Sequence, residues 1–507
     1  MTDIAGLSGV ARAAGRDASV RSISDTLRTL VIAAGIGASV LFVAVGVGYQ
    51  LQFYADGSLF SYAVAVRDAW AFHCHNISGR LSVYLFAFAP AEAYVQLTGD
   101  PHGGVVLYGA IFFAAQGLGL LLTWVLDRSR DRIIFAYACM SAACLCPLVL
   151  GFPTEVWMMH ALFWPTLAAC HHARRGVAGA ALILALMLAL TFTHGGALIS
   201  LAAILSTLAL RGLRDAALRR ACGIFLLVVA AWVIVKTMLR PDDYMAAVLV
   251  RAALHVFDIS ILTGDFMTLL LCALAGYAIA FHALRHLEGR AHLYAGALVA
   301  GALALYWLRF DHALHADNRY YLRTVLLIAT PAFGFFAAAH PLSSEGYLSE
   351  GYLALPWLPR VMAVLTGDVM ARAATGAVLV VMLIHGVETV KFLRAWTGYK
   401  TAVRSLAAGK ASDPALGDPR FVSSKRIGAD LNRLSWFSTT PFLSVLLAPN
   451  LKPGRLVVHP TANYFWLSCE TATENLQARR ALPAESRELV RVYSCLHRRR
   501  RAPSSGS

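Results

Sequence analysis

The sequence is poor in charged residues, which make up only 14% of its 507 residues. A soluble domain would carry about 25% charged residues. The mean hydropathy is +0.60, and apolar runs of about 20 residues, the length that crosses the hydrocarbon core of a bilayer, recur along most of the chain. The alternating strands of a membrane barrel are missing. The sequence therefore predicts an all-α polytopic membrane protein.

Several other signals are also missing. The nine cysteines show no zinc-type pairing, and most of them lie in or beside apolar runs, where they suit packing. The sequence has no phosphate-binding Walker motif, no dinucleotide fingerprint and no heptad repeat. We also find no internal repeat of the kind that many transporters carry.

The apolar runs and the positions of arginine in short loops predict the membrane topology. The Arg-containing segment 1–28 is expected on the cytoplasmic side, and an odd number of spans then puts the C-terminus outside. With this assignment the basic short loops all fall on one side of the membrane and the carboxylate-rich loops on the other. The transmembrane domain, 29–390, has about 11 predicted spans: 29–50, 103–126, 133–150, 156–170, 177–193, 197–210, 222–239, 266–283, 292–308, 324–339 and 373–390.

The first outer loop, 51–102, is expected to hold two membrane-surface segments. Residues 58–72 resemble an amphipathic helix lying in the membrane plane. Residues 81–98 are apolar but short and contain Pro90, which favours a re-entrant or interfacial segment. Residues 353–367 are broken by proline; if they cross the membrane, the C-terminus lies inside instead.

Residues 391–507 are expected to form a small, basic, mixed domain outside the membrane. This segment contains 19 Lys and Arg against 7 Asp and Glu, a net charge of +12. On a membrane protein this charge suits anionic lipid or polysaccharide, and we expect no nucleic-acid partner. A helix over 391–408, a surface helix over 441–450 and short strands near 455–460 and 464–467 are predicted.

Ionisable residues gather at the predicted outer ends of the spans, where they are costly to keep without a function. Asp56, Asp68 and Glu155 are the candidate catalytic carboxylates, since a carboxylate can act as a general base. Each also has a structural interpretation: Asp56 as a helix cap, Asp68 as part of a solvated face, and Glu155 as a partner of a helix dipole.

Basic and aromatic residues in the same loops are candidates for binding a phosphate and a ring-shaped substrate. Snorkelling arginines in an aromatic belt are the alternative interpretation. Asp317 and His315 have metal-compatible side chains, but their spacing matches no specific metal motif. The candidate substrate-binding residues are Trp70, His73, His75, Arg80, Trp157, His315, Asp317, Arg319 and Arg323.

The layout resembles the GT-C superfamily of integral membrane glycosyltransferases, which use polyprenyl-phosphate-linked sugars. Asp56 matches the acidic position that follows the first span, Glu155 the acidic residue of the second outer loop, and 391–507 the outer C-terminal domain. Trp70 and the Gly79-Arg80 pair match a first-loop pattern of bacterial members. The sequence departs from the family in one respect: the adjacent acidic pair common in that loop is here Asp56-Gly57, so Asp68 stays a candidate base.

The resemblance implies sugar transfer to a cell-envelope glycan or lipid on the outer face of the membrane. The Ala-, Arg- and Gly-rich composition favours a bacterial inner membrane. A carboxylate would deprotonate the acceptor hydroxyl, which would attack the anomeric carbon with inversion while the lipid phosphate leaves. Some members use a divalent cation such as Mg²⁺ or Mn²⁺, and no specific motif here indicates one. The alternatives are an enzyme like the O-antigen polymerases and ligases, or a non-enzymatic membrane transporter.

Overall fold

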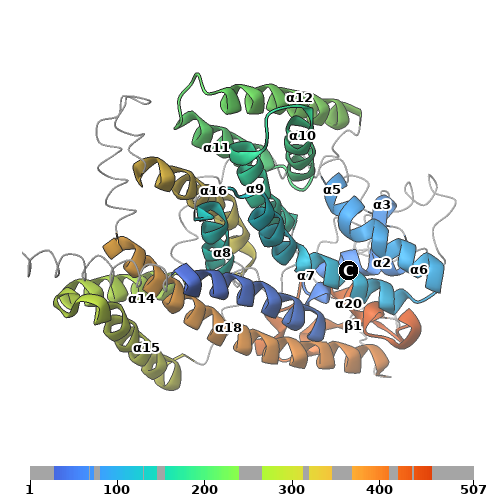
Figure 1. The fold of residues 1–507 in the computed structure, drawn as a ribbon. Coiled ribbons are helices and arrows are strands. Elements are labelled where there is room, and N and C mark those ends of the chain that lie inside the picture. The colour runs from blue at the N-terminus through green and yellow to red at the C-terminus, as the bar shows by residue number, and fades with distance from the viewer. Residues whose placement is uncertain are drawn as a thin grey trace, which may run out of the picture.

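The computed structural model describes ten segments of the chain, and they form a bundle of helices with one small sheet (Figure 1). Together these segments fit the predicted all-α membrane protein. The described residues are 28–67, 69–72, 80–129, 131–145, 155–238, 265–311, 319–344, 368–409, 421–436 and 439–458.

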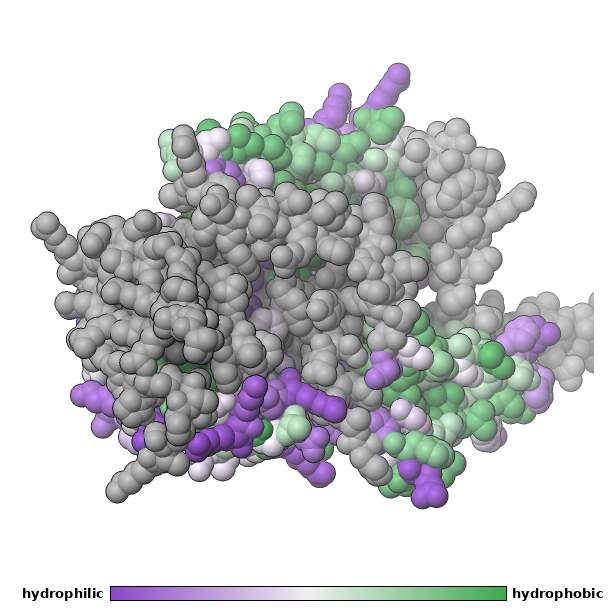
Figure 2. Space-filling model, turned by 180° about the vertical axis from the view of Figure 1, so that it is seen from behind, coloured by the Kyte–Doolittle hydropathy of each residue, from purple (hydrophilic) through white to green (hydrophobic). Residues whose placement is uncertain are grey.

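Six helices in these segments are long and apolar enough to cross a membrane. They are the first helix (Arg28–Gly48), α7 (Pro101–Leu126), α12 (Ala216–Met238), α14 (Asp265–Ala283), α15 (Ala291–Arg309) and α18 (Asp368–Ala408). Many large apolar side chains on α12, α14 and α15 are exposed, and Figure 2 shows the hydrophobic surface that they help to form. Such apolar outer faces suit contact with lipid.

The predicted count of about 11 spans is not shown, although a helix overlaps each predicted span. The other five helices are α8 (Ile133–Leu145), α9 (Glu155–His172), α10 (Val177–Thr191), α11 (Ala197–Ala209) and α16 (Arg319–Ser344). As described, α8, α10 and α11 have 13, 15 and 13 residues, fewer than the roughly 20 that span a bilayer. Apolar composition alone does not show where turns interrupt a run.

The first outer loop begins with the short helix η1 (Leu51–Phe53), followed by α2 (Asp56–Ala65) and α3 (Ala69–Phe72). The prediction of an amphipathic surface helix over 58–72 is wrong, because every residue of α2 after Asp56 is buried. The helix packs between α6, α7 and the C-terminal helix α20. Its serines face protein groups: the Ser61 hydroxyl donates to the Gln52 carbonyl at 2.9 Å.

Residues 81–98 are helical from end to end. They comprise α5 (Leu81–Val83), a π-helical turn, η2 (Tyr84–Phe88), and α6 (Ala89–Thr98), which packs along α7. Pro90 directly follows the π-helical turn, at the point where the chain continues as α6. Single π-helical turns of this kind are frequent at functional sites.

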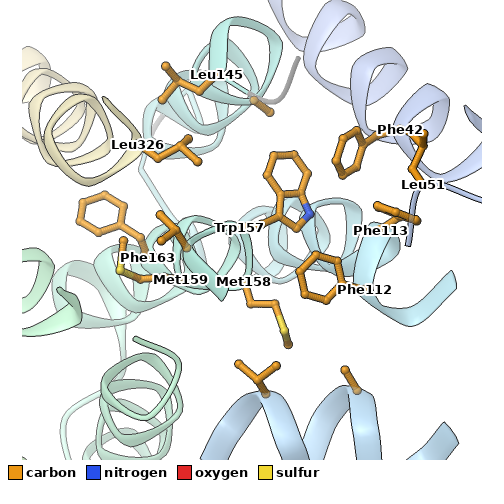
Figure 3. Close-up of a cluster of buried hydrophobic side chains, with 14 of the residues drawn as sticks. Phe42, Leu51, Phe112, Phe113, Leu145, Trp157, Met158, Met159, Phe163 and Leu326 are labelled. Carbon is orange, nitrogen blue, oxygen red and sulfur yellow. The ribbon is translucent and has the colours of Figure 1, made fainter. Parts of the chain in front are cut away.

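Aromatic side chains fill the centre of the bundle, where the first helix, α7 and α9 meet (Figure 3). Phe42 packs against Trp157 and Phe113, with ring centroids 4.3 and 5.2 Å apart. Next to Trp157, the buried His160 ring lies between the Ser141 hydroxyl and the Gln116 amide oxygen, each 2.8 Å away. These contacts join α7, α8 and α9 through both apolar packing and hydrogen bonds.

The C-terminal part begins with α18, which runs without a break through the predicted domain boundary at residue 390. Lys391 and Arg394 therefore lie within one continuous helix. Strands β1 (Phe421–Ser423) and β2 (Leu456–Val458) form a parallel pair, which confirms a strand near 455–460. The remaining short helices are η5 (Arg285–Arg290), η9 (Ser424–Arg426), α19 (Ala429–Asn432), α20 (Thr440–Leu446) and η10 (Pro449–Leu451).

Close packing of α7 on α9 gives a test of this arrangement. A Cβ atom at Gly119 would overlap the Ala161 backbone, whereas a Cβ at Gly117, on the same helix, has no atom within 4 Å. We expect Gly119→Ala to lower the free energy of unfolding by about 1–3 kcal/mol, as overpacking does. Gly117→Ala should leave thermal unfolding in detergent unchanged or slightly raised. Equal behaviour of the two variants would contradict the packing.

Candidate functional site

A buried ion pair joins the first outer loop to the start of α9. The Arg80 guanidinium lies 2.6 Å from a Glu155 carboxylate oxygen, and the two side chains are 25% and 7% exposed. Arg80 immediately precedes α5, and Glu155 is in the first turn of α9. A buried charge is tolerated only beside a compensating charge, so each residue fixes the other.

Asp56 lies in the same region, at the first position of α2. The preceding residue, Ala55, has φ 51° and ψ −129°, a conformation that L-residues rarely adopt. Ala55, and not Asp56, is the N-cap residue of α2, while Asp56 lies in the first turn, where a carboxylate also suits the helix dipole. Strained backbone of this kind is found most often next to functional residues.

Tyr108 on α7 lies near both carboxylates and the arginine. Its side chain is fully buried and lies within electrostatic reach of Glu155, Arg80 and Asp56. Lys236, near the end of α12, is in turn close enough to Arg80 to be affected by its charge. Five separate elements of the chain therefore bring two carboxylates, two cations and a phenol into one region, which we call the polar site.

A series of aromatic rings packs against the polar site. The Arg80 guanidinium lies over the Phe60 ring, 5.8 Å from its centroid. The Phe60 ring packs against Phe88 at 5.5 Å, and Phe88 stacks on Tyr108 at 5.1 Å with only 9° between the ring planes. This series of rings links α2, the π-helical turn and α7, and it fixes the orientation of Tyr108.

The C-terminal elements hold the helix that carries Asp56. The Ser58 hydroxyl donates to the Thr439 carbonyl at 3.1 Å, and the Tyr62 ring packs against Phe442 at 5.1 Å. Because both partners lie just before or within α20, this part of the chain is on the same side of the bundle as the first outer loop.

Helix α18 holds the start of the same loop. The Trp396 indole N–H and the Lys400 ammonium group both donate to the Tyr49 carbonyl, at 3.0 and 2.8 Å. The Tyr54 ring lies between Phe392 and Trp396. Helix α18 therefore contacts the chain on both sides of η1, at Tyr49 and at Tyr54.

The structure does not bring all the predicted site residues together. Trp70 is 43% exposed and packs on Tyr84, while Trp157 is fully buried in the core beside Phe42. Arg319 and Arg323 lie on α16, in a stretch whose side chains are not described. The remaining predicted residues lie outside the described segments: Asp68, His73, His75, His315 and Asp317.

A second ionic cluster lies where α15 and α18 meet. The Lys391 ammonium group is 3.0 Å from an Asp311 oxygen and 3.1 Å from a Glu388 oxygen, and both carboxylates are nearly fully buried. Asp311, which follows α15, is thereby joined to α18 through Lys391. The Glu388-x-x-Lys391 spacing, within an otherwise apolar helix, is the signal that could have revealed this cluster.

Two polar residues near the first loop were missed from the sequence. Tyr108 is one apolar-looking aromatic among many in its span, and only the fold shows what surrounds it. Glu92 accepts a hydrogen bond from the Ala69 N–H at 2.6 Å, and burial raises the pKa of its carboxyl group. An acidic residue in the middle of a short apolar segment was the available signal for Glu92.

The described residues do not fit a divalent cation. They contain no group of three or more histidine, cysteine or acidic side chains placed to hold a metal. In the polar site Glu155 already pairs with Arg80, whose charge would repel a metal ion. We therefore derive no chemical step through a metal.

Comparison with known proteins adds no assignment: no protein-family model matches the sequence, and neither curated proteins nor solved structures show a significant match. The function therefore has to be inferred from the polar site and the membrane helices around it.

The Arg80–Glu155 pair predicts an asymmetric response to mutation. Arg80→Met should lower the free energy of unfolding by about 3 kcal/mol, because it leaves a buried carboxylate without its partner. Adding Glu155→Gln should recover part of that loss, since the remaining side chain is then neutral. Thermal unfolding of the full chain in lipid nanodiscs measures both, and a double variant less stable than Arg80→Met would contradict the pairing.

The raised pKa of Glu92 predicts a pH effect. Because the folded state binds this proton more tightly than the unfolded state does, stability should fall as pH rises from the ordinary value of 4.5 through the raised folded-state pKa. Glu92→Gln has no such proton and should show a smaller fall over that interval. Parallel melting curves between about pH 4 and 7 test this, and identical pH profiles would contradict it.

Proposed function

We propose that this protein is a membrane glycosyltransferase that moves a sugar from a polyprenyl-phosphate donor to a cell-envelope glycan or lipid acceptor. The observation that supports it most is the convergence of Asp56, Arg80 and Glu155, from three separate segments, beside the end of a membrane-crossing helix. Such groups are expensive near a membrane, which favours a functional explanation.

In this proposal Asp56 is the general base. Its carboxylate accepts the proton of the acceptor hydroxyl, and the acceptor oxygen attacks the anomeric carbon from the face opposite the phosphate. The bond between the anomeric carbon and the phosphate oxygen breaks, and its electron pair leaves with the polyprenyl phosphate, which inverts the anomeric configuration. General base catalysis of this kind is worth about 10²–10⁴ in rate.

Arg80 is proposed to stabilise the charge on the leaving phosphate, because guanidinium groups bind phosphate oxygens well. Lys236 adds a second positive charge nearby. Glu155 holds the Arg80 guanidinium in place through the 2.6 Å contact. Arg319 and Arg323 remain proposed phosphate ligands on the sequence evidence.

We place the reaction on the outer face of a bacterial inner membrane. The arginine distribution of the short loops supports this orientation, and the hydrogen bond from Ser58 to Thr439, next to α20, is compatible with it. A reporter fused after Ser507 and active only outside the cytoplasm should therefore be active. Activity of a cytoplasmic reporter instead would contradict the orientation.

The activity is tested with the full chain in nanodiscs and a panel of radiolabelled polyprenyl-phosphate hexoses, by following transfer to cell-envelope glycolipid. Asp56→Asn should reduce transfer at least about 100-fold, because the amide cannot accept the proton. Glu155→Gln should reduce it at least about 10-fold, because Arg80 loses its charged partner.

Asp100→Asn is the matched control, since Asp100 is an exposed carboxylate before α7, and its transfer rate should not change. Normal transfer by Asp56→Asn, with expression intact, would rule out Asp56 as the base. Normal transfer by Glu155→Gln would leave Glu155 with a structural role at the start of α9.

The Asp311–Lys391–Glu388 cluster favours a second candidate, a transporter, because such proteins keep ionisable groups among their membrane helices. A transporter would move protons or a charged solute across sealed liposomes in a Glu388-dependent way, without sugar transfer. Turnover of a polyprenyl-phosphate hexose with no such flux would favour the glycosyltransferase.

A further inference from the structure

Tyr108 has a hydroxyl group that the fold itself does not use. The residue is fully buried, and its hydroxyl oxygen has no hydrogen-bond partner within the described segments. Burying a polar group without a partner typically costs about 1–3 kcal/mol. A phenylalanine would fill the same space without that cost, so the hydroxyl is left open to a ligand.

Charged side chains from three elements lie near this hydroxyl. Glu155, Arg80 and Asp56 all lie within its electrostatic reach, and they come from α9, the residue before α5, and α2. The ring itself is fixed by parallel stacking on Phe88 and by contact with Phe112, 5.1 and 5.9 Å between centroids. The hydroxyl therefore has one position, among the charged groups proposed to act on the substrate.

The charges nearby favour a neutral ligand oxygen. Of the three charged groups that act on the phenol, only Arg80 is a cation, and it already pairs with Glu155, so together they favour an uncharged group beside the phenol. A sugar hydroxyl suits this place, since it can donate its proton to a carboxylate and accept one from the phenol O–H. Sites that bind sugar hydroxyls in this way discriminate strongly against analogues that lack the hydroxyl.

We propose that Tyr108 is a specificity-determining residue whose hydroxyl donates a hydrogen bond to one ring hydroxyl of the transferred sugar, between Asp56 and the Arg80–Glu155 pair. This inference rests on the proposed function and deepens it. It assigns recognition of the neutral sugar to α7 and leaves the phosphate to the cations. No proton is transferred to or from Tyr108 in the reaction.

The test is a deoxy-sugar series on the full chain in nanodiscs. The donor is the polyprenyl-phosphate hexose that the wild-type protein turns over best, together with its four mono-deoxy derivatives. In the wild type, one deoxy position should lose at least about 30-fold in kcat/KM. In Tyr108→Phe the parent donor should lose a similar factor, and the penalty at that one position should shrink to below about threefold.

Tyr277→Phe is the matched control. Tyr277 is also buried on a membrane-crossing helix, and its hydroxyl likewise has no hydrogen-bond partner in the described part, but it lies on α14, away from α2 (Figure 1). Neither its kcat/KM nor its deoxy penalties should change. Thermal unfolding of both variants should match or exceed that of the wild type, because each loses an unsatisfied hydroxyl.

The outcomes separate this inference from the function beneath it. An active wild type whose deoxy penalties are all retained in Tyr108→Phe overturns the role of Tyr108 alone. A wild type that turns over no polyprenyl-phosphate hexose overturns both the inference and the proposed function. Loss of activity in Tyr108→Phe with a lowered melting temperature and unchanged deoxy penalties indicates a structural role and also overturns the inference.

Discussion

The polar site depends on one interaction, the buried contact between Arg80 and Glu155. Without it, the first outer loop and the start of α9 would each bring an uncompensated charge into an apolar bundle. With it, the loop is fixed at one point against the bundle, and α2 and the π-helical turn can pack around that point. The ion pair is therefore both a structural constraint and, in our account, part of the machinery that binds the lipid phosphate.

Contacts from α7, α18 and α20 also limit movement of the first outer loop. Helix α18 binds the Tyr49 carbonyl, α20 covers α2, and the rings of Phe60, Phe88 and Tyr108 connect the loop to α7. Because a binding or catalytic group must be held to within a fraction of an ångström, rigid support of this kind is what a transfer site needs. The C-terminal part contributes to the site by holding α2 and not by supplying a charged group among the described residues.

Much of this could be predicted from the sequence, and the failures have physical causes. The apolar runs predicted a helix at each span, and the structure has a helix overlapping every one of them. The cost of burying charge identified Asp56, Arg80 and Glu155 as candidate site residues. Burial of α2 was missed because its partner, α20, lies about 380 residues away, and no local pattern encodes that contact. Tyr108 was missed because a tyrosine in an apolar span is ordinary until its neighbours are known. The contact between Asp311 and Lys391 was not predicted, because Lys391 was taken as the beginning of another domain.

The central claim is that Asp56, Tyr108 and the Arg80–Glu155 pair form one sugar-binding site at the membrane surface. A cryo-electron-microscopy structure of the full chain in a nanodisc, with a non-hydrolysable polyprenyl-phosphonate hexose, tests it most directly. The account predicts sugar density within hydrogen-bond distance of Asp56 and Tyr108, with the phosphonate beside Arg80 and the ion pair intact. Density beside Lys391 and Glu388 instead, or separation of Asp56 from Glu155, would contradict it.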